Sequence, residues 1–302
     1  RKAIRSIKEL SVAGVKTNTG FLINVLNREE FHKGLCDTHF IADNPSLFDI
    51  APKTDKELKV LRYIGEKVVN ETKGSKKDFD VPVAPMPPRP SGLVGTKQIL
   101  DAKGPEGLVS WIHEQKKLLI TDTTMRDAHQ SLMATRVRTR DMTRIARATS
   151  VYGNDLFSLE MWGGATFDVA YRFLNESPWE RLEDLRQRIP NVMFQMLLRG
   201  SNAVGYKNYP DNVISAFIKQ SSISGIDIFR IFDSLNWVDG MKLAIEEVRK
   251  NNKVAEACIC YTGDILDETR DKYTLKYYVD MAKELERLGA NILGIKDMAA
   301  LL

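Results

Sequence analysis

The chain is poor in cysteine and histidine, the residues that form disulfides and many zinc sites. Only three cysteines and four histidines occur among 302 residues. Cys36, Cys258 and Cys260 are too few for a disulfide framework or a four-ligand zinc site. No apolar run reaches the roughly 18 residues of a membrane-spanning helix, and no signal-peptide pattern is present. We therefore expect a reducing compartment and no association with a membrane.

An excess of charge of one sign is also lacking. The 44 basic and 40 acidic residues are interspersed and give a net charge of +4. Without a basic stripe interleaved with aromatic residues, a nucleic-acid partner is not expected. The hydrophobic content of 43% and charged content of 28% are typical of a globular protein, long enough for one large domain or two smaller ones.

Composition shifts in the proline-rich stretch "KGSKKDFDVPVAPMPPRPSGLVG", where we place the domain boundary. Residues 1–45 are expected to form a small α/β segment, with a helix over Phe21–Phe31 and a short strand in "CDTHFI". A helix between Asp55 and Asn70 and an extended proline-rich linker should follow. The chain starts without Met inside a helical pattern and stops inside an apparent element, so we expect a segment of a longer polypeptide.

Beyond residue 96, apolar strands alternate with amphipathic helices. Strands are expected at Leu118–Thr121, Leu156–Met161, Val192–Leu198, Ile226–Phe232, Val254–Tyr261 and Asn291–Ile295. Helices are expected at 140–152, 211–225, 238–251 and 274–289, with Gly225 and Gly289 as C-caps. A spacing of roughly thirty to forty residues is that of a βα unit. Six units in series predict a parallel sheet, either doubly wound or part of a barrel.

Polar side chains follow every predicted strand at its carboxyl end. They are Arg126, Asp127, Gln130, Asp168, Arg199, Asp233, Asp264, Lys296 and Asp297. A barrel collects such residues around one rim, whereas an open sheet gathers them at a single crevice. The pattern therefore favours an α/β fold containing about six units of an incomplete TIM (β/α)₈ barrel.

Some of these residues have ordinary explanations. Asp233 and Asp297 fit helix caps as well as they fit function, and Asp264 fits a loop. Cys258 and Cys260 should face the same side of a strand as small apolar residues. Lys296 is harder to explain, because an ammonium at the end of a buried strand needs a partner or a modification.

Five motifs in order resemble the carboxyltransferase domain of the pyruvate carboxylase family. They are "TDTTMRDAHQSLMATRVRT", "WGGATFDVAYRFLNESPWERL", "FQMLLRGSNAVGYKNYPDNV", "FRIFDSLN" and "GIKDMAALL". The resemblance implies that residues 96–302 are the truncated carboxyltransferase barrel. Residues 1–45, with "AGVKTNTGFLINVLN" and "DTHFI", resemble the C-terminal end of the biotin carboxylase domain of that family. Residues 46–95 would be a linker, allosteric or oligomerisation region.

The resemblance also implies roles for individual residues. Asp127 and an N-carboxylated Lys296 would bind Mn²⁺ or Zn²⁺, and the carbamate would account for the lysine. The family's His-x-His ligand pair and its proton-shuttling threonine would follow Leu302. Gln130 and Arg199 match positions that hold the pyruvate carboxylate. Positions around the biotin and substrate pocket are matched by Arg126, Asp168 and Tyr206, with Arg126 among the catalytic residues. Ala300 stands where the family usually has glycine.

The implied activity is biotin-dependent carboxylation of pyruvate to oxaloacetate. Carboxybiotin would arrive on a separate carrier domain after ATP and Mg²⁺ are used upstream. A homotetramer and activation by acetyl-CoA are implied by the family. The bacterial cytoplasm is preferred over the mitochondrial matrix as its location.

Three alternatives remain at this point. One is the carboxyltransferase subunit of a transcarboxylase or oxaloacetate decarboxylase, although the biotin-carboxylase-like segment argues against it. A second is a barrel with metal-assisted aldol or Claisen chemistry, such as an acyl-CoA lyase or synthase, where the lysine ligand is not expected. The third is a scaffold or oligomerisation module without activity. With six barrel units and half of the metal ligands, the isolated chain is expected to be inactive.

Overall fold

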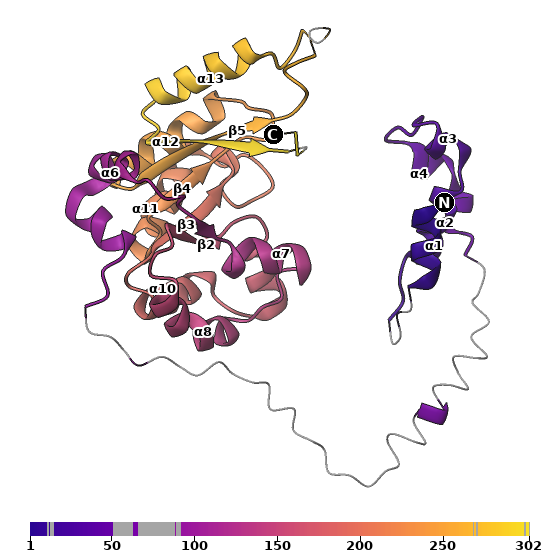
Figure 1. Cartoon of the computed structure of the whole chain (residues 1–302), viewed down its shortest axis with the longest axis horizontal. Helices are drawn as coiled ribbons and strands as arrows, with labels where there is room; N and C mark the ends of the chain where they lie inside the picture. Colours follow the sequence, from indigo (N-terminus) through magenta and orange to yellow (C-terminus); the bar gives the residue numbers. More distant parts are fainter. Residues whose placement is uncertain are drawn as a thin grey trace. The chain divides into compact units, whose positions relative to one another are not determined.

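The computed structural model describes residues 1–10, 12, 15–50, 63–65, 88, 92–267, 269, 271–298 and 300–301. The chain separates into two compact units, Arg1–Pro82 and Val83–Leu302 (Figure 1). The helix expected between Asp55 and Asn70 and the proline-rich linker lie almost entirely outside the described residues. No described helix is long and apolar enough to cross a bilayer.

The described part of the first unit is helical. Its elements are α1 Lys2–Glu9, α2 Thr19–Leu26, α3 Glu29–His32, α4 Phe40–Asp43 and the 3₁₀ turn η1 Pro45–Phe48. The ring of Phe21 stacks on that of Phe48, with centroids 5.1 Å apart. Asn24 in α2 donates from Nδ2 to the carbonyl of Leu47 at 3.0 Å. These contacts fasten α2 to η1.

Two expectations for this unit are wrong. Residues 36–41 do not form a strand: the Asp37 carboxylate accepts the His39 N–H at 2.9 Å, and the resulting turn leads into α4. The single helix over Phe21–Phe31 is two helices, because Arg28 between α2 and α3 has an extended backbone (φ −75°, ψ 138°). The described part of residues 1–45 is therefore all-helical, rather than α/β.

The second unit is built on a parallel sheet of six strands. They are β1 Thr121–Asp122, β2 Ser158–Trp162, β3 Met193–Leu198, β4 Ile228–Ile231, β5 Val254–Tyr261 and β6 Ile292–Asp297. The strands are hydrogen-bonded in sequence order from β1 to β6, each parallel to the next. A doubly wound sheet reverses its strand order part-way, whereas a barrel does not. The prediction of an incomplete TIM barrel with about six units is confirmed.

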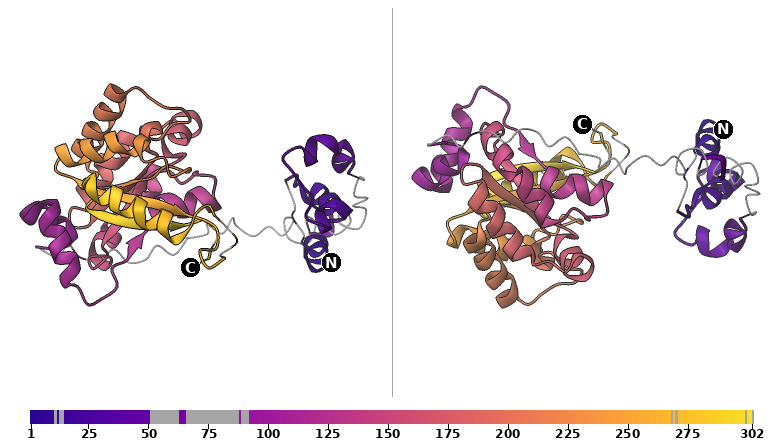
Figure 2. Two further views of the ribbon diagram at one scale, coloured as in Figure 1. Left: turned by 90° about the horizontal axis from the view of Figure 1, so that it is seen from above. Right: turned by 90° about the horizontal axis from the view of Figure 1, so that it is seen from below.

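Long helices connect the strands along the outside of the sheet (Figures 1 and 2). They are α8 Thr139–Tyr152, α10 Pro178–Arg188, α11 Asp211–Ser224, α12 Asp239–Lys250 and α13 Leu275–Arg287. The four helices expected from the sequence agree with these bounds within two residues. Gly225 and Gly289 follow α11 and α13 with φ of 127° and 95°, a conformation that glycine adopts without steric cost.

Short helical segments follow the first three strands. They are the π-helix η3 Thr124–Ala128 and α7 His129–Leu132 after β1, α9 Thr166–Val169 and the π-helix η4 Ala170–Leu174 after β2, and the 3₁₀ turn η5 Gly200–Asn202 after β3. Each begins within four residues of its strand or of the preceding segment. These segments therefore form part of the rim at the carboxyl ends of the strands.

The first strand is shorter than expected. Leu118–Thr121 was predicted as a buried strand, but pairing begins only at Thr121, opposite Ser158. The Leu118 side chain is 87% exposed. β1 lies at one edge of the sheet, so its outer side has no strand neighbour within the described residues.

The two faces of the sheet differ in chemistry. Side chains alternate between faces along a strand. One set, including Leu159, Phe194 and Phe229, is fully buried in the main hydrophobic core with the outer helices. The other set is turned to the inside of the half-barrel and carries the polar residues of the strands. It includes Ser158, Glu160, Gln195, Arg230, Glu256, Cys258 and Lys296.

A helix that the sequence analysis did not predict, α6 Thr96–Glu114, lies at the amino ends of the strands, opposite α7 (Figure 1). Thr96 Oγ1 donates to the Phe157 carbonyl at 2.9 Å and accepts the Met193 N–H at 3.2 Å. Leu100 and Leu108 pack in a second core with Met193, and with Ile228 and Val254. The helix thus covers this end of the sheet.

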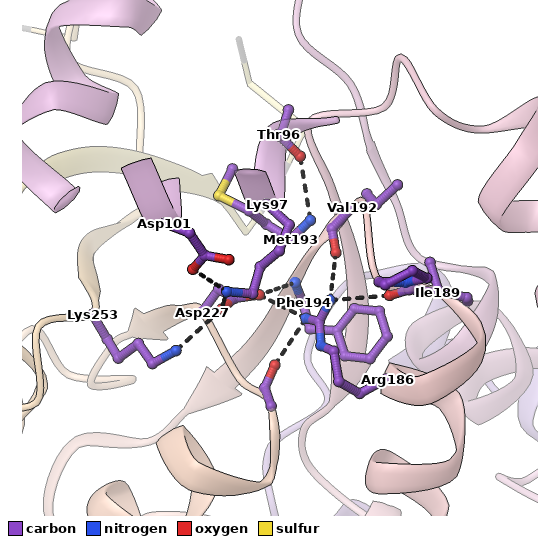
Figure 3. A network of polar contacts seen from close by, with 12 residues as sticks. Thr96, Lys97, Asp101, Arg186, Ile189, Val192, Met193, Phe194, Asp227 and Lys253 are labelled. Atoms are coloured by element: carbon purple, nitrogen blue, oxygen red, sulfur yellow. Dashed lines mark hydrogen bonds and ion pairs between the residues drawn. The ribbon is translucent and has the colours of Figure 1, made fainter. Parts of the chain in front are cut away.

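One buried carboxylate organises the same end (Figure 3). Asp227, which has no exposed surface, contacts Arg186 at 2.6 Å, Lys253 at 3.1 Å and Lys97 at 3.5 Å. It also accepts the Phe194 N–H at 2.9 Å. Burial by itself raises the pKa of Asp227, but attraction by the three cations and this N–H brings the pKa below its usual value. We call these four charged residues the amino-end cluster.

Candidate functional site

A cavity of about 480 Å³ opens on the inner face of the half-barrel. Its lining residues are Thr123, Arg126, Asp127, Gln130, Glu160, Gly164, Leu197, Arg199, Arg230, Phe232, Glu256, Cys258, Gly294, Ile295 and Lys296. They come from all six strands or from the segments that follow them. Its volume suits a small organic substrate with a few polar groups to orient it.

A π-helical turn brings two of the predicted site residues to this cavity. In η3 the N–H groups of Arg126 and Ala128 both donate to the Thr123 carbonyl, each at 3.1 Å. Asp122 at the end of β1 accepts the Thr124 N–H at 3.0 Å and fixes the start of the turn. Such widened turns are common at functional sites. Here the turn directs Arg126 and Asp127 into the cavity in succession.

Buried ionic and amide side chains form a line across the floor of the cavity. Arg126 makes close contacts with Glu160, which is 2% exposed, and donates to Asp127 at 2.8 Å. Arg230 lies 3.9 Å from Glu160 Oε2 and 3.0 Å from Glu256 Oε1. Gln195 completes the line with a close hydrogen bond to Glu256 Oε2. We call Arg126, Glu160, Arg230, Glu256 and Gln195 the inner network; this line also reaches Asp127.

The electrostatics of the inner network follow from its burial. Burial raises the pKa of Glu160, and attraction by Arg126 and Arg230 only partly offsets that effect. Burial lowers the pKa of Arg230, but the attraction by Glu256, Cys258 and Glu160 and the hydrogen bond to Glu256 together outweigh burial, so the net direction is upward. Arg230 therefore remains charged and faces both glutamates, while Glu160 faces both arginines.

Two further cations face the cavity without an ion pair among the described residues. Arg199 follows β3, and the structure gives no hydrogen bond or ion pair to its guanidinium. Lys296 in β6 places Nζ 3.8 Å from the centroid of the Phe232 ring. A guanidinium free to bind two oxygens and an ammonium beside an aromatic face make this part of the cavity suited to an anion.

Gln130 lines the cavity, and its side-chain amide lies against Gly164. Its Oε1 accepts the Ala165 N–H at 3.3 Å. Gly164 has φ of 41°, and a Cβ there would lie 2.9 Å from Gln130 Oε1. The family position occupied by Ala300 also has a left-handed backbone, with φ of 52°, which glycine would adopt with less strain.

The cysteines of β5 lie on the inner face with Phe232, as expected of small apolar residues. Burial, reinforced by the negative charge of Glu256, raises the pKa of Cys258 to about 12. The pKa of Cys260 is also raised, first by burial. Both thiols stay protonated near neutral pH and are poor nucleophiles.

Five of the seven predicted site residues line this one cavity, and two do not. Asp168 in α9 pairs with Arg172 at 3.1 Å. Tyr206, in the loop before α11, is 71% exposed. Asp233, which the sequence left between cap and function, accepts the N–H groups of Leu235 at 2.8 Å and Trp237 at 3.0 Å.

Sequence reasoning missed the floor of the cavity. Glu160, Gln195, Arg230 and Glu256 were absent from the predicted site because they lie inside strands rather than after them. A signal was present: each interrupts an apolar run, as in "SLEMW", "IFRI" and "VAEAC". A charge within a buried strand needs a partner, and four such polar residues on neighbouring strands could have been paired with one another.

The donor set for the expected metal is partial. Asp127 and Lys296 line the same cavity, so both can approach one ion, the lysine only after N-carboxylation. Among the described residues no group of three or more His, Cys, Asp or Glu side chains is arranged to hold a metal. The residues present therefore fit at most two positions of a coordination shell.

Comparison with known proteins reveals relatives along the whole chain. It is 59% identical over 311 residues to pyruvate carboxylase from Bacillus subtilis, a match that covers all of this chain and 27% of that protein. The chain is similar throughout to one segment of pyruvate carboxylase. Mitochondrial pyruvate carboxylase from Rattus norvegicus is 50% identical over 309 residues, covering 100% of this chain and 26% of that one. The chain thus spans about a quarter of the length of these relatives. No family model matches the sequence.

Solved pyruvate carboxylase structures match the fold. The carboxyl transferase domain of the Rhizobium etli enzyme, determined with pyruvate and biocytin, has a TM-score of 0.68 and 54% identity, covering 73% of this chain and 37% of that one. A variant of the Rhizobium etli pyruvate carboxylase determined with the allosteric activator acetyl coenzyme A has a TM-score of 0.68 and 46% identity, covering 100% of this chain and 29% of that one.

Proposed function

We propose that this chain contributes the floor and much of the rim of a carboxyltransferase site that converts pyruvate to oxaloacetate in a biotin-dependent enzyme. The observation that carries the proposal is the cavity in which Arg126, Asp127, Gln130, Arg199 and Lys296 lie together. The similarity to pyruvate carboxylase structures determined with pyruvate supports the same conclusion.

The unpaired arginine suits one end of the substrate. The carboxylate of pyruvate binds the Arg199 guanidinium in a two-point interaction, and the Gln130 amide donates a further hydrogen bond. Pyruvate then presents its keto oxygen and methyl group to the opposite side of the cavity. Holding the substrate this way makes carbon–carbon bond formation effectively intramolecular.

The opposite side carries charge for the reacting atoms. Arg126, fixed by Glu160, donates toward the keto oxygen as negative charge develops on it. Asp127 and an N-carboxylated Lys296 would hold a divalent ion, Mn²⁺ or Zn²⁺, and that ion would supply Lewis-acid stabilisation of developing negative charge. Leu197 and Phe232 help to exclude water, which protects CO₂ delivered from carboxybiotin.

The partners and domain roles are part of the proposal. Residues 1–45 belong to the end of a biotin carboxylase domain, 46–95 to a linker, allosteric or oligomerisation region, and 96–302 to the carboxyltransferase barrel. Asp168 and Tyr206 serve the biotin pocket. The complete enzyme is a homotetramer that uses ATP and Mg²⁺ and responds to acetyl-CoA. A bacterial cytoplasm is favoured as its location, although relatives include mitochondrial enzymes.

The test uses the complete enzyme with Arg199→Ala. We expect kcat/KM for pyruvate in oxaloacetate formation to fall about 100-fold or more, mainly through KM, because a charged two-point contact is lost. ATP cleavage coupled to biotin carboxylation should not change. Arg140→Ala, a substitution of an arginine whose side chain is 79% exposed on α8, is the matched control. A normal KM in the Arg199 variant would contradict the proposed function.

A further inference from the structure

The inner network is fully connected. Each oxygen of its two glutamates has a partner: Arg126 and Arg230 for Glu160, and Arg230 and Gln195 for Glu256. Gln195 Oε1 in turn accepts from Ser158 at 3.5 Å. A buried network without unsatisfied members holds each side chain in one arrangement.

Strand register explains how the network forms. Glu160 of β2 lies opposite Gln195 of β3, and Arg230 of β4 lies opposite Glu256 of β5. Arg230 lies opposite Leu197, two residues beyond Gln195 on the same face of β3, so the side chains project from four adjacent strands in two pairs that are offset by two residues. Only Arg126 comes from outside the sheet, from η3. The network consequently ties the π-helical turn to the rigid strands.

At its Arg126 end, the inner network reaches the candidate site. Arg126 Nη1 donates to Asp127 Oδ1 at 2.8 Å, so the direction of the Arg126 guanidinium constrains this carboxylate. Arg126 is in turn oriented by Glu160, and Glu160 also faces Arg230. A displacement at Arg230 can therefore reach Arg126 through two contacts and Asp127 through three.

We propose that Glu160, Arg230 and Glu256 are positioning residues, which set the Arg126 guanidinium and, through it, the Asp127 carboxylate for the carboxyl-transfer step. The inference rests on the proposed function of the cavity. Arg230 is the central member, since it alone contacts both glutamates. Without it, the buried carboxylates of Glu160 on β2 and Glu256 on β5 lose the cation between them, and Glu160 can shift the Arg126 guanidinium from its position.

A role in stability alone does not explain the arrangement. Buried ion pairs often contribute little net stability compared with apolar side chains of similar size. Arg230 also borders the cavity, with 28% of its side chain exposed, whereas the amino-end cluster lies at the other end of the strands. Misplacement of a catalytic group by about 1 Å costs about 100-fold in rate, so the network has its largest effect on turnover.

The experiment is a double-mutant cycle in the complete enzyme. It compares Arg230→Met, Arg126→Lys and the double variant by kcat and KM for pyruvate. We expect Arg230→Met to lower kcat about 30-fold with KM changed less than about threefold, and Arg126→Lys to lower kcat about 100-fold. Because both act through the same guanidinium, the double variant should resemble Arg126→Lys rather than show the product of the two losses.

One conservative variant and one control are added to the double-mutant cycle. Arg230→Lys keeps a cation that can reach one glutamate, so it should recover several-fold of the activity lost in Arg230→Met. Arg144→Met, an exposed arginine on α8, should behave as wild type. Biotin carboxylation and the thermal transition of each variant establish that the enzyme is folded.

The outcomes separate the inference from the proposed function. Multiplicative losses in the double variant, or a raised KM with unchanged kcat for Arg230→Met, overturn the positioning role. If the wild-type complete enzyme forms no oxaloacetate, or Arg199→Ala keeps a normal KM, the proposed function fails instead.

Discussion

At the amino end of the sheet, one buried carboxylate is surrounded by three cations, whereas at the carboxyl end two cations face a cavity without an ion pair among the described residues. The amino-end cluster places Asp227 within 3.5 Å of Arg186, Lys253 and Lys97. At the other end, the structure gives no ion pair to Arg199 or Lys296. The same parallel strands separate the two arrangements.

The difference indicates what each end is for. Charges that pair with one another inside the protein stabilise one packing arrangement, but they are not available to bind a ligand. Unpaired charges beside a cavity cost desolvation energy, which a bound anion recovers. The amino end is therefore expected to govern folding, and the carboxyl end is expected to govern chemistry. Parallel α/β barrels divide stability and catalysis between their two ends in this manner.

The largest expected effect lies at the carboxyl end. In the complete enzyme, Asp127→Ala or Lys296→Ala should reduce pyruvate-dependent oxaloacetate formation about 10³-fold or more, because the proposed metal site loses a ligand. Biotin carboxylation measured as ATP cleavage should persist. Oxaloacetate formation at a near-normal rate in either variant is incompatible with the proposed metal site.

The matching change at the amino end should affect stability. Asp227→Asn leaves three cations around a neutral amide, and breaking a buried pair typically costs about 3 to 5 kcal/mol. In the complete enzyme, the urea midpoint for loss of hydrogen-exchange protection in α6 and β4 should fall. At low urea, kcat should stay near normal. Lys250→Met, which removes exposed ion pairs on α12, should leave the midpoint unchanged.

A smaller effect is expected at Glu176, on the flank of the barrel. Its carboxylate accepts from Thr139 N at 3.0 Å, Thr139 Oγ1 at 2.7 Å and Arg181 at 2.9 Å. Burial opposes ionisation, but these hydrogen bonds and Arg181 lower the pKa of Glu176 from 4.5 to about 2. A lowered folded-state pKa stabilises the protein above the unfolded value, and this contribution disappears as pH falls from about 4.5 to about 2.

The corresponding variant is Glu176→Gln. At neutral pH it should lower the free energy of unfolding by about 2 to 3 kcal/mol. The gap to wild type should narrow below pH 4.5. Urea unfolding followed by exchange in α8 and α10 measures both quantities, and a gap that stays constant with pH would show that ionisation of Glu176 is not the cause.

The smallest effect concerns the shape of the cavity. A Cβ at Gly294 would lie 2.6 Å from Cys258 Sγ and 3.1 Å from Glu256 Oε1. Gly294→Ala should therefore disturb the inner network and lower kcat/KM for pyruvate about tenfold. Steady-state kinetics with Gly65→Ala as control, where a Cβ meets nothing within 4 Å, test this. Equal kinetics in both variants would argue that the spacing at Gly294 does not matter.

Strand spacing was enough to predict the parallel sheet, and the polar residues at the strand ends favoured a barrel and located most of its rim. Val254–Tyr261 was predicted with the bounds that the structure has, because its apolar pattern, interrupted only by Glu256, is bounded by polar residues. β1 was misplaced because the apolar run Leu118–Ile120 precedes the two residues that actually pair. Local pattern does not report which residues of an edge strand find a partner.

Three features that the sequence analysis did not predict are the inner network, α6 and the turn at 36–41. The inner network depends on the register between strands that are far apart in sequence. In the sequence Glu160 and Arg230 have no evident partner, because it does not show that β2 and β4 belong to one sheet. α6 was missed because Gly104, with φ of 67°, and Pro105 interrupt its helical pattern. The turn that replaces the strand at 36–41 depends on one Asp37 hydrogen bond. The inner network and the turn at 36–41 are decided by tertiary or side-chain contacts, and α6 contains a local break in its helical pattern; periodicity alone reports none of them.

The most direct test of the central claim is the content of bound metal in the complete enzyme. Elemental analysis should find about one Mn²⁺ or Zn²⁺ per chain in wild type, and far less in Lys296→Gln, which cannot form the carbamate. Lys207→Gln, a substitution of an exposed lysine in the loop after β3, should retain the wild-type amount. Full metal content in Lys296→Gln would contradict a site shared by Asp127 and Lys296.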